Sequence, residues 1–130
     1  MNLANDRVGK LVLRVVLGVV ILFHGVGKLK GGVGPIEGML VAQGLPGVVA
    51  YGVYVGEVLA PILVILGLYA RIGGLLIAIN MLFALWLAHS AEVFALNAQG
   101  NWAIEFQALL LAAGLAVMFL GPGKPAFNDK

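Results

Sequence analysis

Four apolar stretches, each close to 20 residues long, constrain this chain more than any other feature. They cover residues 11–27, 48–68, 72–91 and 102–120. A helix needs about 20 mainly apolar residues to cross the hydrocarbon core of a bilayer. The charged fraction is 11%, against about 25% in a typical soluble domain. We therefore predict one transmembrane domain with an all-α fold, an integral membrane four-helix bundle whose spans run up, down, up and down.

The connections between the predicted spans are short. Residues 31–47 are rich in Gly and Pro, yet apolar residues recur there at helical spacing. We expect a short interfacial helix in this segment, beginning after Pro35 and ending at Gly44. Residues 69–71 alone separate the second span from the third, so these two helices are expected to be antiparallel neighbours.

The cationic side chains fall mainly on one side of the predicted membrane. With the N-terminus inside, the cytoplasmic side holds Arg7, Lys10, Arg71, Lys124 and Lys130, with Arg14 close by. The other side holds Lys28 and Lys30. The positive-inside rule therefore predicts that both termini lie in the cytoplasm.

The composition narrows the chemistry. The chain has no Cys, no Thr and a single Ser, Ser90, which excludes thiol redox chemistry, disulfides, thiolate metal sites and a Thr nucleophile. Any redox role must therefore depend on a cofactor. The eight Lys and Arg residues form no dense run of the kind that a nucleic-acid site or a polybasic lipid site needs. We expect no nucleic-acid partner.

Several polar side chains interrupt the predicted spans. They are Arg14, His24, Glu57, Asn80, His89, Glu105 and Gln107. A charged residue at mid-bilayer costs about 2.5 to 3.5 kcal/mol on insertion scales, so such residues usually face the bundle interior and find partners. Their depths in the spans predict two pairs of histidine and carboxylate. One is His24 with Glu57 near the midplane, and the other is His89 with Glu105 near the outer surface.

Glu57 is the strongest candidate for a ligand or proton site. Pro61 stands four residues later and cannot donate to the Glu57 carbonyl, so we expect a kink and a free oxygen beside the carboxylate. Tyr54, three residues earlier, adds a hydroxyl to the same face, and Lys28, one turn after His24, can extend the polar pocket. The alternative is that Glu57 only locks helices together.

Other polar residues have structural interpretations. Arg14 either snorkels to the inner surface or reaches up toward Glu57. Asn80 is expected to bond between helices. The two histidines could in principle hold haem or a metal with the two glutamates, but no ligand spacing within a helix supports this, and we expect no metal site.

Small residues line up on one face of each predicted span. The rows are Gly18 and Gly25 with Arg14; Gly52 and Gly56; Gly73, Asn80, Ala84 and Ala88; and Glu105, Ala108, Ala112 and Ala116. Small residues let membrane helices approach closely. We expect these rows to face the interior of the bundle.

Several short motifs follow one another in order. They are Arg14 with His24, Gly25, Lys28 and Leu29; Gly44, Leu45 and Pro46; Glu57 with Gly67, Leu68 and Arg71; Met81; His89; Glu105; and Gly121, Pro122 and Gly123. In this order and spacing the chain resembles the DoxX family of small bacterial and archaeal four-helix membrane proteins. The ending departs from the family: a basic residue and Ser-Leu-Asp usually follow Gly-Pro-Gly, whereas residues 124–129 read Lys-Pro-Ala-Phe-Asn-Asp. We expect a different C-terminal cap.

The resemblance implies a plasma-membrane protein associated with electron-transfer systems. Related proteins include a subunit of thiosulfate:quinone oxidoreductase, and members are linked with oxidative-stress complexes. Most members have no settled activity. The residues that match the family pattern and should be tested first are His24, Lys28, Glu57, Arg71 and Glu105.

Two functions fit these observations. The first is an accessory subunit of a membrane oxidoreductase that holds a quinone or similar lipophilic ligand among spans one, two and four. His24 and Glu57 would bind its polar end and handle protons, and the other pocket residues would be Lys28, Tyr54, His89 and Glu105. Its partners would be the lipid bilayer, a membrane or peripheral redox protein, and a second copy of the chain. The second function is a non-catalytic scaffold or small permease whose polar interior serves packing, partner docking or solute passage.

Overall fold

The computed structural model describes residues 5–130, and this part of the chain is helical. The elements are α1 (Asp6–Gly31), α2 (Gly34–Ala42), η1 (Gly47–Gly52), η2 (Val55–Leu59), α3 (Ala60–Leu66), α4 (Ala70–His89), η3 (Ser90–Glu92) and α5 (Glu105–Leu120). Three helical segments are long and apolar enough to cross a membrane, namely residues 6–31, 47–66 and 70–92. The fourth, α5, is apolar but only 16 residues long. The all-α fold is confirmed.

The first helix extends beyond the apolar run that predicted it. The expected span of residues 11–27 lies inside α1, which begins at Asp6 and ends at Gly31. The Asn5 side chain accepts a hydrogen bond from the Val8 amide at 3.1 Å, so the helix is capped before its apolar part begins. Gly32 ends the helix with φ +79°, a backbone conformation that favours glycine. Polar turns therefore flank the apolar segment at both ends.

The second span is assembled from three helical pieces. η1 is a 3₁₀ helix, η2 is a single π-helical turn, and α3 is a short α-helix. The second span is irregular where the kink before Pro61 was expected: a π turn covers residues 55–59, and the Ala60 amide donates to the Val55 carbonyl. π turns inside helices are frequent at functional sites.

The expected interfacial helix and tight turn are both present. α2 begins at Gly34, with Pro35 in its first turn, and the chain leaves the helix through Gly44 at φ +80°. Between α3 and α4, Gly67 and Tyr69 both adopt left-handed conformations, with φ of +71° and +48°. This turn makes α3 and α4 adjacent helices that pack against each other.

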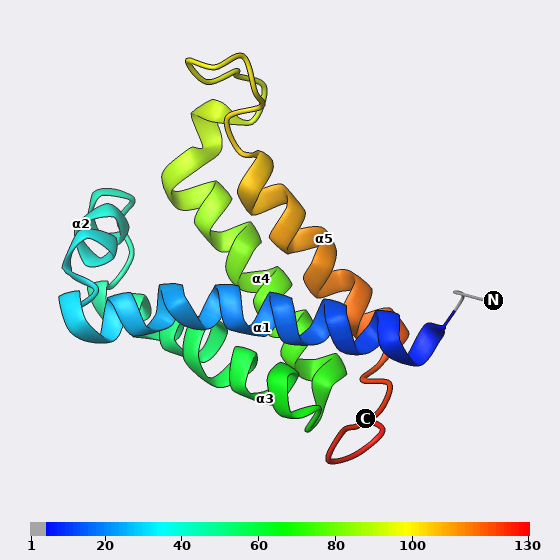
Figure 1. The fold of residues 1–130 in the computed structure, drawn as a ribbon. Helices are drawn as coiled ribbons and strands as arrows, with labels where there is room; N and C mark the ends of the chain where they lie inside the picture. Colours follow the sequence, from blue (N-terminus) through cyan, green and yellow to red (C-terminus); the bar gives the residue numbers. More distant parts are fainter. Residues whose placement is uncertain (1–4) are drawn as a thin grey trace.

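The helices form two pairs that cross. In Figure 1, α1 runs across the molecule beside α3, and α4 and α5 form a second pair that rises away from them toward the loop of residues 93–104. α4 packs on both α3 and α5, and α1 touches the lower part of α5. The start of α1, the α3–α4 turn and the C-terminal segment lie at the same end of the molecule (Figure 1). The α2 helix lies near the opposite end of α1.

Glycines bring the helices into backbone contact. A Cβ atom on Gly25 would overlap the Glu57 carbonyl, so α1 and η2 touch directly. A Cβ on Gly74 would lie 2.6 Å from the Gly114 carbonyl oxygen, so α4 and α5 touch in the same way. The glycine face predicted for the first span is confirmed at Gly18 as well, because a Cβ there would lie 3.0 Å from the Pro61 oxygen.

The small-residue face predicted for the last span is wrong. Glu105 and Ala112 are exposed, and the buried side of α5 consists of Leu110, Gly114 and Val117. α4 approaches through Gly74, and only another glycine permits backbone contact at that point. Because of this close contact with α4, the face of α5 that carries Gly114 is buried, and the face with the row of alanines is not.

The C-terminal segment, residues 121–130, folds back on the α3–α4 turn. The Phe127 amide donates to the Leu66 carbonyl, and the Asn128 amide donates to the Gly67 carbonyl, both at 3.2 Å. These bonds satisfy carbonyls at the end of α3 that have no partner within the helix. The segment therefore acts as a cap for this end of the bundle.

We predict that Gly25→Ala destabilises the protein by about 2 kcal/mol, because the added methyl group would force α1 away from the π turn. The matched control is Gly27→Ala, two residues along the same helix, where a Cβ meets nothing within 4 Å. That change should leave stability unchanged or raise it by up to about 1 kcal/mol through helix propensity. Thermal unfolding in mild detergent measures both, and equal stabilities for the two variants would contradict the close contact.

Candidate functional site

A buried carboxylate lies where three helical elements meet. Glu57, on η2, is 5% exposed. The Lys28 ammonium, from the end of α1, donates to Oε1 at 2.6 Å, and the Asn80 amide, from α4, donates to Oε2 at 3.0 Å. Both carboxylate oxygens therefore have a donor, one of them cationic. We call Glu57, Lys28 and Asn80 the polar cluster.

Local backbone features place Glu57 at this junction. The π turn directs the Glu57 carbonyl toward Gly25 of α1, and the missing side chain at Gly25 leaves room for it. Gly56 likewise leaves room for α4, since a Cβ there would lie 2.5 Å from the Asn80 Cβ. The sequence Gly56-Glu57 before Pro61 thus brings the carboxylate between α1 and α4.

Tyr54 supports the polar cluster by bonding to the backbone of Lys28. Its hydroxyl donates to the Lys28 carbonyl at 3.0 Å and not to the carboxylate. The bond connects the second span to the last turn of α1. The Lys28 side chain is 27% exposed, so the ion pair lies at the edge of the bundle and is not fully enclosed.

The polar cluster borders a cavity of about 200 Å³, which we call the polar cavity. Its polar wall consists of the three cluster residues. Its remaining lining is apolar and comes from Ile36, Met39, Val53, Phe83, Ala84, Leu87 and Ala88. A ligand in this cavity would meet charge and amide groups on one side and hydrocarbon on the others.

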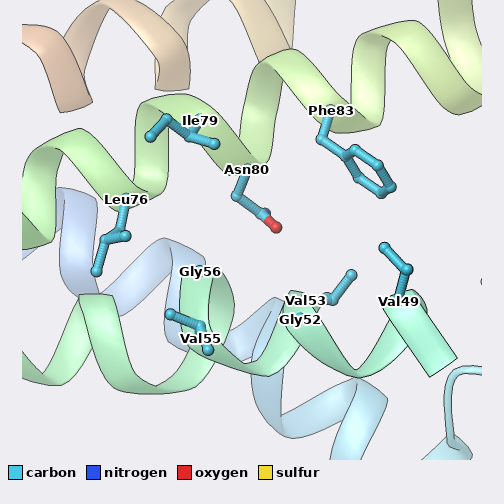
Figure 2. Close-up of a pocket in the computed structure, with 9 residues that line it drawn as sticks. All are labelled: Val49, Gly52, Val53, Val55, Gly56, Leu76, Ile79, Asn80 and Phe83. Atoms are coloured by element: carbon cyan, nitrogen blue, oxygen red, sulfur yellow. The ribbon is translucent and has the colours of Figure 1, made fainter.

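A second, more open cavity of about 330 Å³ lies between the second span and α4. We call it the apolar groove, and Figure 2 shows its lining, with Asn80 pointing from α4 toward Gly52 and Gly56. It shares Val53, Asn80 and Phe83 with the polar cavity. Exposed valines and Ile79 line its outer side, so it opens on the surface that would face lipid.

The predicted contact between His24 and Glu57 is wrong. Lys28 and Asn80 occupy the two carboxylate oxygens, while His24 is exposed and its ring lies 5.6 Å from that of Phe106. His24 precedes Gly25, the residue that faces Glu57, and adjacent helical positions point about 100° apart. The rotation of α1 therefore turns His24 toward α5.

The predicted pair of His89 and Glu105 is wrong as well. His89 Nδ1 lies 3.3 Å from Glu92 Oε2, a neighbour in the 3₁₀ turn that follows α4. Glu105 is exposed and has no ion pair within residues 5–130. The loop of residues 93–104 separates the end of α4 from the start of α5, so His89 lies next to Glu92 and not next to Glu105.

Neither expectation for Arg14 is met. It is 1% exposed and does not approach Glu57; instead its Nη2 donates to the Pro125 carbonyl at 2.5 Å. Its guanidinium lies against Gly67, where a Cβ would collide with Nη1. Nε and Nη1 are buried without a hydrogen-bond partner. Arg14 therefore belongs to the C-terminal cap and not to the polar cluster.

The expected interhelical bond of Asn80 is confirmed, but its partner was missed. Asn80 is 8% exposed and bonds Glu57, so it is part of the candidate site. The signal for this was present in the sequence: Gly56 lies next to Glu57, and a glycine leaves space for a side chain from the facing helix. Among residues 5–130, no group of three or more His, Cys, Asp or Glu side chains could hold a metal ion.

Comparison with known proteins shows which proteins this chain resembles. The family profile described as DoxX matches residues 9–90. A curated protein of Bacillus subtilis (strain 168) named "Putative oxidoreductase CatD" is 32% identical over 115 residues, which is 88% of this chain and 81% of that protein. No solved structure matches the chain significantly.

We predict that Lys28→Met destabilises the protein by about 2 kcal/mol, because it leaves the buried Glu57 carboxylate with only an amide partner. The double variant Lys28→Met/Glu57→Gln should recover most of the loss, since the neutral side chain no longer needs a cation. Lys30→Met, two residues away and exposed, should stay within about 0.5 kcal/mol of wild type. Unfolding free energies in detergent test this, and a Lys28→Met protein as stable as Lys30→Met would disprove the stabilising role of the ion pair.

Proposed function

Because the chain belongs to the DoxX family of multi-pass membrane proteins, we propose that it is a redox-associated membrane protein that binds a quinone or similar lipophilic ligand beside Glu57. One observation carries the proposal. The polar cavity and the apolar groove are neighbours that share Val53, Asn80 and Phe83 in their linings. A polar head group and a hydrocarbon tail need such a pair of adjoining spaces.

The size and lining of the two cavities support an amphipathic ligand. Small-molecule sites are mostly apolar, with a few placed polar groups that orient the ligand, and have volumes of about 300 to 1,000 Å³. The polar cavity of about 200 Å³ is suited to a ring with oxygen acceptors, and the groove of about 330 Å³ to part of an isoprenoid tail. Entry would be from the bilayer, because the outer lining of the groove is exposed.

The polar cluster supplies what such a head group requires. The Lys28 ammonium and the Asn80 amide are hydrogen-bond donors for a carbonyl oxygen, and the Glu57 carboxylate can accept a proton and, once protonated, return it. A bound quinone would supply two-electron, two-proton chemistry. Because the chain has no Cys, the electrons would come from a membrane or peripheral redox partner.

His24 keeps a part in the proposal at a new place. It lies on the exposed side of α1, one turn before Lys28, and we propose that it exchanges protons with the Lys28 end of the cluster. His89 and Glu105 line neither cavity. We assign them no contact with the ligand.

The distribution of cations supports the orientation of the bundle. Arg7, Lys10, Arg71 and Lys124 lie together at one end, and Lys28 is at the other end of α1. By the positive-inside rule the first end faces the cytoplasm. The protein then lies in the plasma membrane of a bacterial or archaeal cell with both termini inside and the polar cluster in the outer half of the bilayer.

The natural test is ligand extraction and titration. Protein purified in mild detergent should release a quinone detectable by absorbance and mass spectrometry, and ligand-free protein should bind added quinone. If the wild-type protein neither carries nor binds quinone, the proposed function is wrong.

We predict that Gly52→Leu raises the Kd for a long-tailed quinone at least tenfold. Gly52 lines the apolar groove and a Cβ there meets nothing within 4 Å, so the new side chain fills the tail space without disturbing the fold. A quinone with a single isoprene unit should lose less affinity. Gly38→Leu is the matched control, because Gly38 also has open space around it but lines neither cavity. Equal affinities for Gly52→Leu and Gly38→Leu would rule out the groove as the tail site.

A scaffold function is the second candidate, and one observation favours it. The polar cluster joins α1, η2 and α4 in a single network, which would stabilise packing without any ligand. Glu57→Gln distinguishes the two functions. If the cluster serves a ligand, the variant should fold with a similar melting temperature and lose quinone binding at least tenfold; if it serves packing alone, the variant should lose folding or assembly instead.

A further inference from the structure

The end of the bundle away from the polar cluster carries a cationic groove. Its volume is about 390 Å³. Four basic side chains line it, Arg7 and Lys10 from α1, Arg71 from α4 and Lys124 from the C-terminal segment, together with the acids Asp6 and Asp129. These residues are scattered over the sequence, and only the fold brings them together.

The basic groups of this groove are not neutralised by ion pairs. Within residues 5–130, ion pairs with nitrogen and oxygen atoms inside 4.0 Å are confined to Lys28 with Glu57 and His89 with Glu92. Arg71 uses Nη1 to donate to the Met118 and Phe119 carbonyls, each at 2.9 Å. Its other guanidinium nitrogens make no hydrogen bond to residues 5–130, so the groove offers four cationic groups against two acids.

The C-terminal segment holds the wall of the groove in place. Gly123, with φ +65°, lies against the stem of Lys10, since a Cβ there would be 2.8 Å from the Lys10 Cβ. Gly121, with φ +81°, lies against the Arg71 guanidinium in the same way. A side chain at either glycine would occupy the space, so the two basic residues are held by backbone contact.

The groove lies at the level where the membrane spans end. α1 begins at Asp6, α4 begins at Ala70 and α5 ends at Leu120, which lines the groove and is 47% exposed. Phospholipid phosphates lie at this level of a bilayer. The first turn of α1 also presents the positive end of its helix dipole, which favours a negative ligand.

We propose that this cationic groove binds the phosphate of an anionic phospholipid from the leaflet at this end. Arg7, Lys10, Arg71 and Lys124 surround the phosphodiester oxygens, and the acyl chains follow the apolar surface that starts at Leu120. The volume of about 390 Å³ is enough for a phosphate with a glycerol-type head group. The inference is independent of the quinone site.

Free phosphate shares the recognised chemistry, and the apolar border of the groove argues for the lipid. An inorganic anion would use the cations alone. A phospholipid also uses Leu120 and the neighbouring exposed Phe119, which is 73% exposed and would otherwise meet only acyl chains of bulk lipid.

Native mass spectrometry of the full chain in nonionic detergent tests the proposal. Phosphatidylglycerol and phosphatidylcholine with identical acyl chains are titrated separately, and inorganic phosphate is titrated in a third arm. The wild type should bind phosphatidylglycerol at least fivefold more tightly than phosphatidylcholine. Lys10→Gln should raise the Kd for phosphatidylglycerol about fivefold, as expected for the loss of one cation at a lipid surface.

Lys30→Gln is the matched control, since it removes the same charge from an exposed position at the opposite end of α1. It should change the Kd less than twofold. Lys124→Gln, in the exposed part of the C-terminal segment, gives the same expected loss if Lys10→Gln fails to fold. Equal binding of the two lipids, or equal losses in Lys10→Gln and Lys30→Gln, overturns the proposal. Displacement of the lipid by millimolar phosphate, with the same sensitivity to Lys10→Gln, assigns the groove to a free anion and overturns the lipid source.

Discussion

The buried carboxylate of Glu57 links three helical elements of this bundle, α1, η2 and α4. A charge inside a membrane protein is tolerated when its oxygens have partners, and here an ammonium and an amide occupy both of them. Those partners come from α1 and α4, so the two helices must approach the second span on opposite sides. Gly25 and Gly56 make both approaches possible, because neither has a side chain to hold the backbones apart.

The same constraint explains the irregular second span. Pro61 cannot donate a hydrogen bond, and the chain widens into a π turn just before it. The turn rotates Glu57 into the junction and exposes its carbonyl to Gly25. Packing cannot be continuous around such a junction, and two adjoining cavities lie beside it. The proposed ligand site is thus a consequence of how the charge is buried. At the opposite end, backbone contacts with Gly121 and Gly123 hold basic side chains around a second groove.

Predictions from the sequence were correct where one residue type determines the local structure. Long apolar runs predicted the helices correctly, Pro61 predicted an irregular second span, and the short connection at residues 69–71 predicted that α3 and α4 are neighbours. They failed where two helices had to be rotated relative to each other. Glu57 was assigned His24 from depth alone, but depth does not give the angular position around α1, and Lys28 faces the carboxylate instead. The sequence placed the four basic residues of the cationic groove on the same side of the membrane, but not in one groove, because they come from three separate parts of the chain.

The order of apolar and polar residues along the chain is enough to show a membrane-spanning all-α protein with an acid in its second span. Hydropathy and the position of proline are local properties, and they need no knowledge of neighbouring helices. The tertiary structure alone decided which side chains meet that acid, that Arg14 bonds the C-terminal segment, and which side of α5 is buried. Those outcomes depend on helix rotation and on close glycine contacts. Both are set by the packing of all the helices together, which no single segment encodes.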